Sequence, residues 1–239
     1  MKLFSSPAKC AYTLRAIAHL LRYPDAGLRA HLPELRAALH AEAALGPDRL
    51  AELDALVGRL QSLPGLRVEA EYVELFDRGR GTALHLFEHV HGDSRERGPA
   101  MIDLARTYAQ AGLDLAPGEL PDYLPVLVEY ASPQPPAQAR AFVGEFAHIL
   151  QSLFSALLRR ESPYAGPVAA LLDLAGLRAQ PVALPEEPGL DESWAEPAAF
   201  DGCSRAGQAR SGAAQPIHLV RSAAAADPCK TPSANGVRP

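Results

Sequence analysis

Leucine at helical spacing, in short blocks separated by proline and glycine, is the feature that most restricts how this chain can fold. Between residues 48 and 63 the apolar side chains recur every three or four positions, at Leu50, Leu53, Leu56, Val57 and Leu60. This spacing places them on one face of a helix. Pro64 and Gly65 then interrupt the pattern, because neither residue continues a helix well. Blocks of this length predict a bundle of short helices.

The same pattern covers most of the chain before residue 176. It predicts helices over residues 7–22, 25–44, 48–63, 66–76, 82–91, 97–112, 120–132, 136–161 and 164–175. Pro121 is expected to begin the helix over 120–132, because proline suits the first helical position. No segment shows the alternation of a β-strand. The predicted fold class is therefore all-α, a single-domain helical bundle.

Residues 136–161 carry the clearest helical pattern. One face is apolar, with Phe142, Phe146, Ile149, Leu150, Leu153 and Leu157. The opposite face is polar, with Glu145, His148, Ser152, Ser155 and Arg159. We expect the apolar face to enter the core and the polar face to meet solvent, as in other amphipathic helices.

Composition supports a helical domain and also divides the chain. Hydrophobic residues make up 48% of the sequence but aromatics only 6%, so Ala and Leu, which favour helices, carry most of the apolar content. After Gly176 the sequence becomes rich in Pro, Ala, Gly and Ser and loses any sustained period. We predict a helical domain over residues 1–176 and a largely disordered tail over 177–239. Trp194 and Phe200 are the only aromatics of that tail.

Charge and cysteine content exclude several protein classes. A net charge of −5 argues against nucleic-acid binding, which usually needs a basic patch. No apolar run reaches the roughly 18 residues of a membrane-spanning helix, and no apolar signal region follows the N-terminus. Cys10, Cys203 and Cys229 lie far apart without a C-x-x-C motif, which argues against a disulfide framework or a thiolate zinc site. These features predict a cytoplasmic protein with no stable membrane insertion.

One short motif suggests a metal site. His85, Glu88 and His89 read H-x-x-E-H, the ligand spacing of the inverted zinc metallopeptidases. On a helix the three side chains would share one face. Glu161 could supply the third protein ligand that a catalytic zinc needs. A zinc hydrolase built on these residues is therefore kept as an alternative function.

The surrounding residues favour a different explanation of that motif. The same segment carries an apolar stripe at helical spacing, formed by Ala83, Leu86, Phe87 and Val90. The histidine face is then the ordinary polar side of an amphipathic helix. Glu161 lies in a charged helix end, and peptidases with this motif are much larger proteins. We therefore predict no catalytic residues and no metal or cofactor in this chain.

Polar and charged residues are unusually dense between Tyr72 and Tyr123. They alternate with apolar residues such as Phe76 and Leu86. A charged groove wall of this kind suits an amphipathic helix or peptide, in which apolar side chains give affinity and charges give register. A solvated surface is the alternative interpretation.

The stretch from residue 72 to 132 also resembles a known family. Its most specific parts are Tyr72-Val73 with Phe76-Asp77, LHLFEHVHGDSRERG at 84–98, Ala100-Met101 with Asp103-Leu104, and GELPDYLPVLVEY at 118–130. Over this part of the chain the sequence resembles the delta subunit of respiratory nitrate reductase, the NarJ-type molybdenum cofactor assembly chaperone.

The resemblance implies an all-helical, single-domain protein that is not an enzyme and holds no cofactor of its own. Such chaperones bind the apo catalytic (alpha) subunit of nitrate reductase in the cytoplasm, notably its N-terminal segment. They permit insertion of the molybdenum cofactor before the complex docks at the membrane. Proteins that deliver this cofactor are further expected partners. A chaperone of another molybdoenzyme, such as a dimethyl sulfoxide or trimethylamine oxide reductase, is the related alternative.

The resemblance also indicates a partner-binding site. The wider chaperone group carries an E-x-P-D-H element, which in this chain ends in tyrosine instead of histidine, at Glu119 to Tyr123. We expect a groove floored by Leu86, Phe87 and Tyr123, in which acidic side chains bind a basic and apolar peptide. Histidines there would make the affinity pH-dependent. The predicted site comprises Tyr72, Phe76, His85, Leu86, Phe87, Glu88, His89, Asp93, Arg95, Arg97, Glu119, Pro121, Asp122 and Tyr123.

Overall fold

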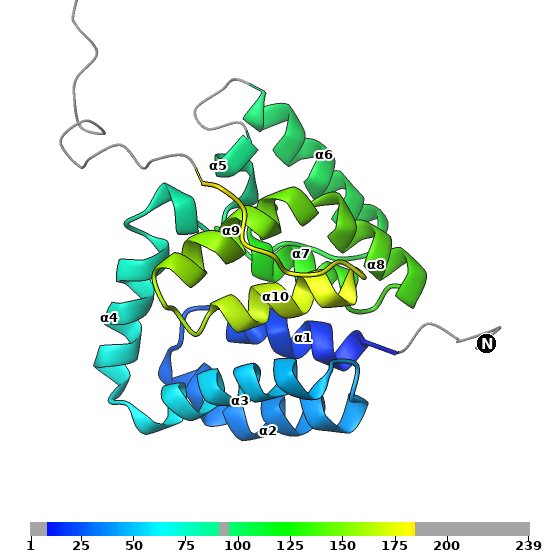
Figure 1. Cartoon of the computed structure of the whole chain (residues 1–239). Coiled ribbons are helices and arrows are strands. Elements are labelled where there is room, and N and C mark those ends of the chain that lie inside the picture. The colour runs from blue at the N-terminus through cyan, green and yellow to red at the C-terminus, as the bar shows by residue number, and fades with distance from the viewer. Residues whose placement is uncertain (1–8, 91–95, 185–239) are drawn as a thin grey trace, which may run out of the picture. The chain divides into compact units, whose positions relative to one another are not determined.

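The computed structural model describes residues 9–90 and 96–184, and within these ranges the chain forms ten α-helices, one short 3-10 helix and no strand (Figure 1). The all-α prediction is confirmed. Residues 91–95, which include Asp93 and Arg95, lie outside the described part. So does the predicted tail from residue 185 onward, with Trp194 and Phe200. The domain boundary at residue 176 stays a prediction.

Most of the helices follow one another with short connections. Their bounds are α1 (Ala11–Leu20), α2 (Ala26–Glu42), α3 (Pro47–Ser62), α4 (Gly65–Phe76), η1 (Arg80–Thr82), α5 (Leu86–Val90), α6 (Arg97–Gln110), α7 (Leu124–Ala131), α8 (Pro136–Glu145), α9 (Ala147–Arg159) and α10 (Ala165–Leu174). The longest described connection joins α6 to α7.

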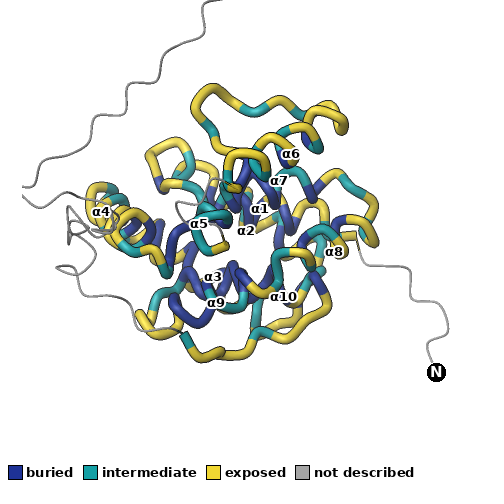
Figure 2. The backbone as a smooth tube through the Cα atoms, turned by 90° about the horizontal axis from the view of Figure 1, so that it is seen from above, coloured by how far each residue is buried: buried dark blue, intermediate teal, exposed yellow. Residues whose placement is uncertain are grey.

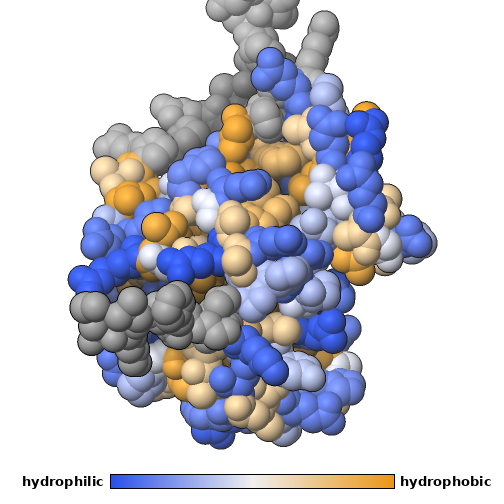
Figure 3. Space-filling model, turned by 90° about the vertical axis from the view of Figure 1, so that its right-hand side faces the viewer, coloured by the Kyte–Doolittle hydropathy of each residue, from blue (hydrophilic) through white to orange (hydrophobic). Residues whose placement is uncertain are grey.

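Helices α1 and α10 form the centre of the domain. Helix α1 packs against α2, α7 and α10, while α10 also packs against α3, α8 and α9. Every residue of α10 from Ala165 to Leu172 is buried, as expected of a helix that is apolar on all sides. Figure 2 shows the buried backbone gathered in the interior and the exposed backbone around it. Hydrophilic and hydrophobic side chains are mixed over the face in Figure 3.

Local sequence signals account for several helix ends. The Asp25 side chain accepts a hydrogen bond from the Leu28 N–H at 2.7 Å and caps α2, a role that Asp fills well. Helix α2 ends with Ala43 in the left-handed region, at φ 48°. Pro47 occupies the first turn of α3, where its missing N–H is not needed.

The predicted helix over 136–161 is wrong as a single element. It divides at Phe146 into α8 and α9, whose axes differ by 67°. The bend allows α8 to pack against α7 while α9 packs against α10. Phe142 lies at the bend, with its ring 4.7 Å from Tyr130 and 5.5 Å from Phe146. These aromatic contacts join α8 to α7, and no periodicity within one helix encodes them.

Ser155 is the second correction in this region. It was predicted on the solvent-facing side of the helix, but only 6% of its surface is exposed. The extended segment after α10 covers it, and the Ser155 hydroxyl accepts a hydrogen bond from the Val182 N–H at 2.9 Å. Gln151, one turn before Ser155 in α9, donates a hydrogen bond to the Gln180 carbonyl of the same extended segment. Residues 177–184 therefore lie against α9.

The helix predicted over 120–132 begins later, at Leu124, so Pro121 does not start it. Pro125 occupies its first turn instead. Tyr123 forms an isolated antiparallel bridge with His85, which holds residues 118–123 outside the helix. For the same reason His85 precedes α5, which begins at Leu86.

Membrane-spanning potential is limited in the described residues. No single helix among them combines the length and apolar content that crossing a bilayer requires, and only the bent pair of α8 and α9 meets that test jointly.

A glycine after α10 gives a test of the fold. Gly176 has φ +76°, and a Cβ there would overlap the Arg140 guanidinium, which donates to the Ala175 carbonyl at 3.0 Å. Replacing Gly176 by Ala should cost roughly 1–3 kcal/mol in the free energy of unfolding, measured by urea denaturation, because the new residue is strained. Gly58, exposed within α3 with nothing near its Cβ position, is the matched control. Gly58→Ala should stabilise by about 0.5–1 kcal/mol. Equal effects of the two changes would contradict this account.

Candidate partner-binding site

The two segments with the most distinctive sequence meet through their backbones. The Leu86 N–H donates to the Asp122 carbonyl at 3.0 Å, and the Leu124 N–H donates to the Leu84 carbonyl at 2.8 Å. Between these bonds His85 stacks on the Tyr123 ring, with centroids 5.1 Å apart. The start of α5 and the start of α7 are thus fixed to each other at the predicted site.

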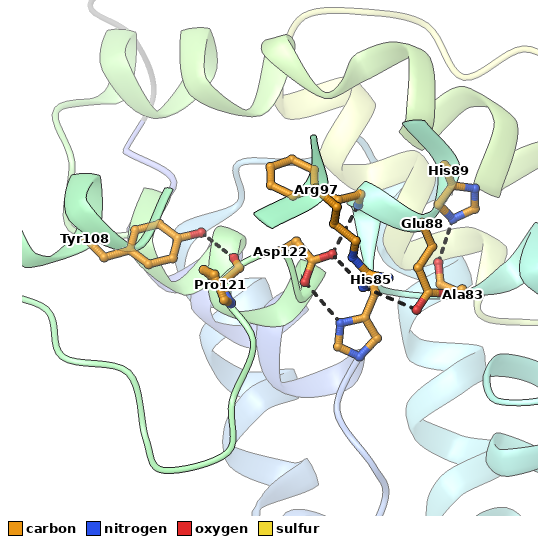
Figure 4. A network of polar contacts seen from close by, with 9 residues as sticks. Ala83, His85, Glu88, His89, Arg97, Tyr108, Pro121 and Asp122 are labelled. Carbon is orange, nitrogen blue, oxygen red and sulfur yellow. Dashed lines mark hydrogen bonds and ion pairs between the residues drawn. The ribbon is translucent and has the colours of Figure 1, made fainter. Parts of the chain in front are cut away.

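The Asp122 side chain lies at the centre of this junction and is fully buried. Its carboxylate accepts a hydrogen bond from the Phe87 N–H at 3.2 Å and lies 3.3 Å from His85 Nδ1. Arg97, from α6, lies 3.5 Å away as its ion-pair partner (Figure 4). A carboxylate oxygen that accepts a hydrogen bond here pairs with the His85 tautomer that carries a proton on Nδ1. A buried charge needs such partners, so Asp122 ties α5 and α6 to the 118–123 loop.

The histidines of the H-x-x-E-H motif do not converge on one point. His85 faces Asp122, whereas His89 Nε2 donates to the Ala83 carbonyl at 2.8 Å. Glu88 pairs instead with Arg97 at 3.5 Å. Figure 4 shows the two rings directed to these different partners. The expectation that all three side chains share one helical face is wrong, because His85 lies before the helix.

No described residues form a metal centre in place of that motif. Across residues 9–90 and 96–184, no group of three or more His, Cys, Asp and Glu side chains is arranged to hold a metal ion. Glu161, considered above as a third zinc ligand, lines a separate pocket with Arg59 and Tyr164. The arrangement at α5 therefore gives no geometric support to a zinc hydrolase.

An aromatic cluster supports the site from inside the domain. The Tyr72 hydroxyl donates to the Leu21 carbonyl at 2.8 Å and lies 3.2 Å from the Tyr123 hydroxyl. The Tyr72 ring packs against Phe76 at 4.6 Å. Burial raises the pKa of Tyr72, and the neighbouring Tyr123 adds to the increase. The phenol therefore stays neutral at physiological pH and acts as a structural hydrogen-bond donor.

Burial separates the predicted site residues into two groups. Seven are partly exposed and form a rim: His85, Phe87, Glu88, His89, Arg97, Glu119 and Tyr123. Five are buried and support that rim: Tyr72, Phe76, Leu86, Pro121 and Asp122. The expected groove floor therefore needs correction, because Leu86 is fully buried in the core and only Phe87 and Tyr123 offer surface.

Two residues that the sequence did not single out hold the 118–123 loop. Tyr108, buried on α6, donates from its hydroxyl to the Pro121 carbonyl at 2.8 Å. Arg22, just after α1, pairs with Glu119 at 3.1 Å and with Glu129 at 3.0 Å. Tyr108 lies within the helix predicted over residues 97–112, but the helical pattern gives no partner for its hydroxyl. Nothing near Arg22 in the sequence marks it.

A pocket of about 290 Å³ lies beside this loop. Glu119 and Glu129 line it, together with apolar side chains that include Leu113, Leu115 and Val126. Carboxylates next to apolar surface suit a partner segment that carries both cationic and apolar side chains.

Loss of the Asp122 carboxylate should loosen the whole junction. Asp122→Ala leaves the Phe87 N–H, His85 and Arg97 without their buried acceptor, so we expect a cost of about 3 kcal/mol in the free energy of unfolding. Asp122→Asn keeps an acceptor for the Phe87 N–H and should cost less. The control is Asp103→Ala, because Asp103 is 75% exposed and pairs only within α6; its effect should stay within about 0.5 kcal/mol. Urea denaturation of the three variants checks this, and similar losses for Asp122→Ala and Asp103→Ala would refute it.

Comparison with known proteins extends the resemblance beyond the site. Residues 22–170 match the family described as nitrate reductase delta subunit. The nitrate reductase molybdenum cofactor assembly chaperone NarJ of Escherichia coli K12 is 44% identical over 159 residues, which is 66% of this chain and 67% of that protein. NarW of the same strain is 42% identical over 163 residues, or 68% of each chain.

A solved structure supports the fold. The crystal structure of a candidate redox enzyme maturation protein from Archaeoglobus fulgidus superposes with a TM-score of 0.50, at 19% identity, over 73% of this chain and 98% of that one. The relatives are thus described as assembly or maturation proteins and not as enzymes, as the resemblance implied. With the family match over most of the helical domain, the chain belongs to the nitrate reductase delta subunit family.

Proposed function

We propose that this protein is an assembly chaperone of membrane-bound respiratory nitrate reductase. It binds the apo catalytic (alpha) subunit, notably the N-terminal segment, and promotes insertion of the molybdenum cofactor before the complex docks at the membrane. The observation that carries this proposal is the 44% identity to the E. coli chaperone NarJ over two thirds of that protein. Its work would take place in the cytoplasm, alongside the proteins that deliver the cofactor.

The rim at α5 and the 118–123 loop suits such a partner segment. Phe87 and Tyr123 present partly exposed aromatic surface, and the same two segments carry the partly exposed carboxylates of Glu88 and Glu119. An amphipathic segment could lay apolar side chains on the rings and direct cationic side chains to the carboxylates. The buried Asp122 holds these groups in place, and a preorganised surface loses less conformational entropy on binding.

A chaperone of this kind needs no catalytic group of its own. Binding the apo subunit at one segment keeps that segment from folding or docking prematurely. The cofactor would then enter a subunit held in an open state. The chaperone acts by differential affinity, since only a partner that binds the apo state better than the mature state shifts the equilibrium between them.

The proposal predicts binding of a synthetic peptide that spans the first residues of the alpha subunit from the same organism. Calorimetry should give a Kd of about 1 µM or below. Phe87→Ala and Glu88→Gln should weaken binding about fivefold or more, because each removes a rim group that meets the peptide. Asp103→Asn, on the exposed side of α6, should leave the affinity unchanged.

Two outcomes would redirect this proposal. If a scrambled peptide binds as well as the native sequence, the rim is not a specific site. If the N-terminal peptide of a dimethyl sulfoxide or trimethylamine oxide reductase binds more tightly, the partner is another molybdoenzyme. A second assay measures molybdenum in alpha subunit purified from cells with and without the chaperone gene. Equal metal content would contradict a role in cofactor insertion.

A further inference from the structure

We infer that Arg22 is a displaceable internal ligand of the Glu119 and Glu129 carboxylates, and that a cationic side chain of the partner takes its place on binding. This inference rests on the proposed function, and it adds Arg22, Glu129 and the pockets beside them to a predicted site that already includes Glu119. It concerns the contacts of Arg22, just after α1, with Glu119 in the 118–123 loop and Glu129 on α7.

The Arg22 ion pairs are made in a weak geometry. One nitrogen, Nη2, lies 3.1 Å from the Glu119 carboxylate and 3.0 Å from that of Glu129. The Arg22 Nε is buried and has no hydrogen-bond partner among the described residues. A guanidinium can bind a carboxylate through two parallel N–H groups, and neither pair here does so. The three side chains are 28–44% exposed, so water can compete for them.

Arg22 also lies between two pockets. A pocket of about 430 Å³ is lined by His19 of α1, Leu28 of α2 and Tyr23 in the connection between them, among others. The pocket of about 290 Å³ beside the loop is lined by Tyr108 and Val126 among others. Arg22 is the one residue that both pockets share. Rotation of its side chain away from the carboxylates would join the pockets into one groove past the candidate site.

The charges that line the groove favour a cationic occupant. Five carboxylates face the two pockets, those of Asp25, Glu34, Asp114, Glu119 and Glu129, and Arg22 is the only Lys or Arg there. The pKa of His19 is lowered, first by burial and then by the Arg22 charge, so this ring is neutral at physiological pH. Leucine side chains line both pockets between the charges. A segment with alternating apolar and cationic residues fits this lining.

Displacement of an internal cation lowers the affinity of the partner that replaces it. The partner must first separate Arg22 from its carboxylates, and this step subtracts from the free energy of binding. Removal of the Arg22 charge should therefore strengthen binding. A purely structural role predicts the opposite, because loss of a loop contact would weaken the site.

The test measures the affinity of the alpha-subunit N-terminal peptide for Arg22→Gln in the full chain. We expect binding about five times tighter than in the wild type. Arg106→Gln is the charge-matched control, because Arg106 is 64% exposed, pairs with Asp103 and lines neither pocket; its effect should stay below about twofold. Glu129→Gln, which leaves Arg22 its other partner, should weaken binding severalfold. Circular dichroism and thermal unfolding establish that each variant is folded.

A double-mutant cycle separates displacement from general charge effects. In a Glu119→Gln, Glu129→Gln background, Arg22→Gln should give no gain in affinity, since the carboxylates that compete for the cation are absent. Unchanged or weaker binding by folded Arg22→Gln, or the same gain in both backgrounds, would overturn the inference and leave the proposed function intact. If the wild type fails to bind the peptide, the proposed function fails instead. The same cycle is then run with a 15-residue amphipathic peptide of Leu and Arg.

Discussion

The buried carboxylate of Asp122 is the interaction on which the site depends. The carboxylate is 0% exposed. It contacts the Phe87 N–H of α5, the imidazole of His85 just before α5, and the Arg97 guanidinium of α6. Burying a charge is unfavourable unless such partners compensate, so the carboxylate strongly disfavours any arrangement in which these elements separate. Removal of one partner from such a network leaves a buried charge without compensation, and this cost exceeds the net stability that the intact network contributes.

Two tyrosines from neighbouring helices also restrain the loop that carries Asp122. The Tyr72 hydroxyl, on α4, donates a hydrogen bond to the Leu21 carbonyl and lies 3.2 Å from the Tyr123 hydroxyl. The Tyr108 hydroxyl, on α6, donates a hydrogen bond to the Pro121 carbonyl. The loop between α6 and α7 is therefore held at Pro121 and at Tyr123, on either side of Asp122 in the sequence. A long irregular segment can act as part of a binding surface when its backbone is restrained in this way.

Periodicity predicted the helices but not the contacts between them. The block over 48–63 became α3 with a shift of one residue at each end, since its leucines and flanking Pro64 are local signals. The helix over 136–161 broke at Phe146, where α8 turns to pack against α7 as well as α10, and local spacing does not encode this contact. The same distinction applies to the site. Most of its residues were identified from the sequence, but the burial of Asp122 and the contacts of Arg22 depend on segments that are distant in the sequence.

Tyrosine at position 123, where the E-x-P-D-H element implied by the resemblance has histidine, changes what this site can do with protons. Burial raises the pKa of Tyr123, so its phenol is neutral at physiological pH and cannot serve as a proton-linked switch there. The ring keeps a structural role instead, because it stacks on His85 and its hydroxyl reaches Tyr72. An imidazole is shorter than a phenol and would not span the same distance to the Tyr72 hydroxyl. The tyrosine thus replaces a group that titrates near neutral pH with a contact to the core. The imidazoles that remain at the site are those of His85, which contacts Asp122, and His89, which contacts the Ala83 carbonyl.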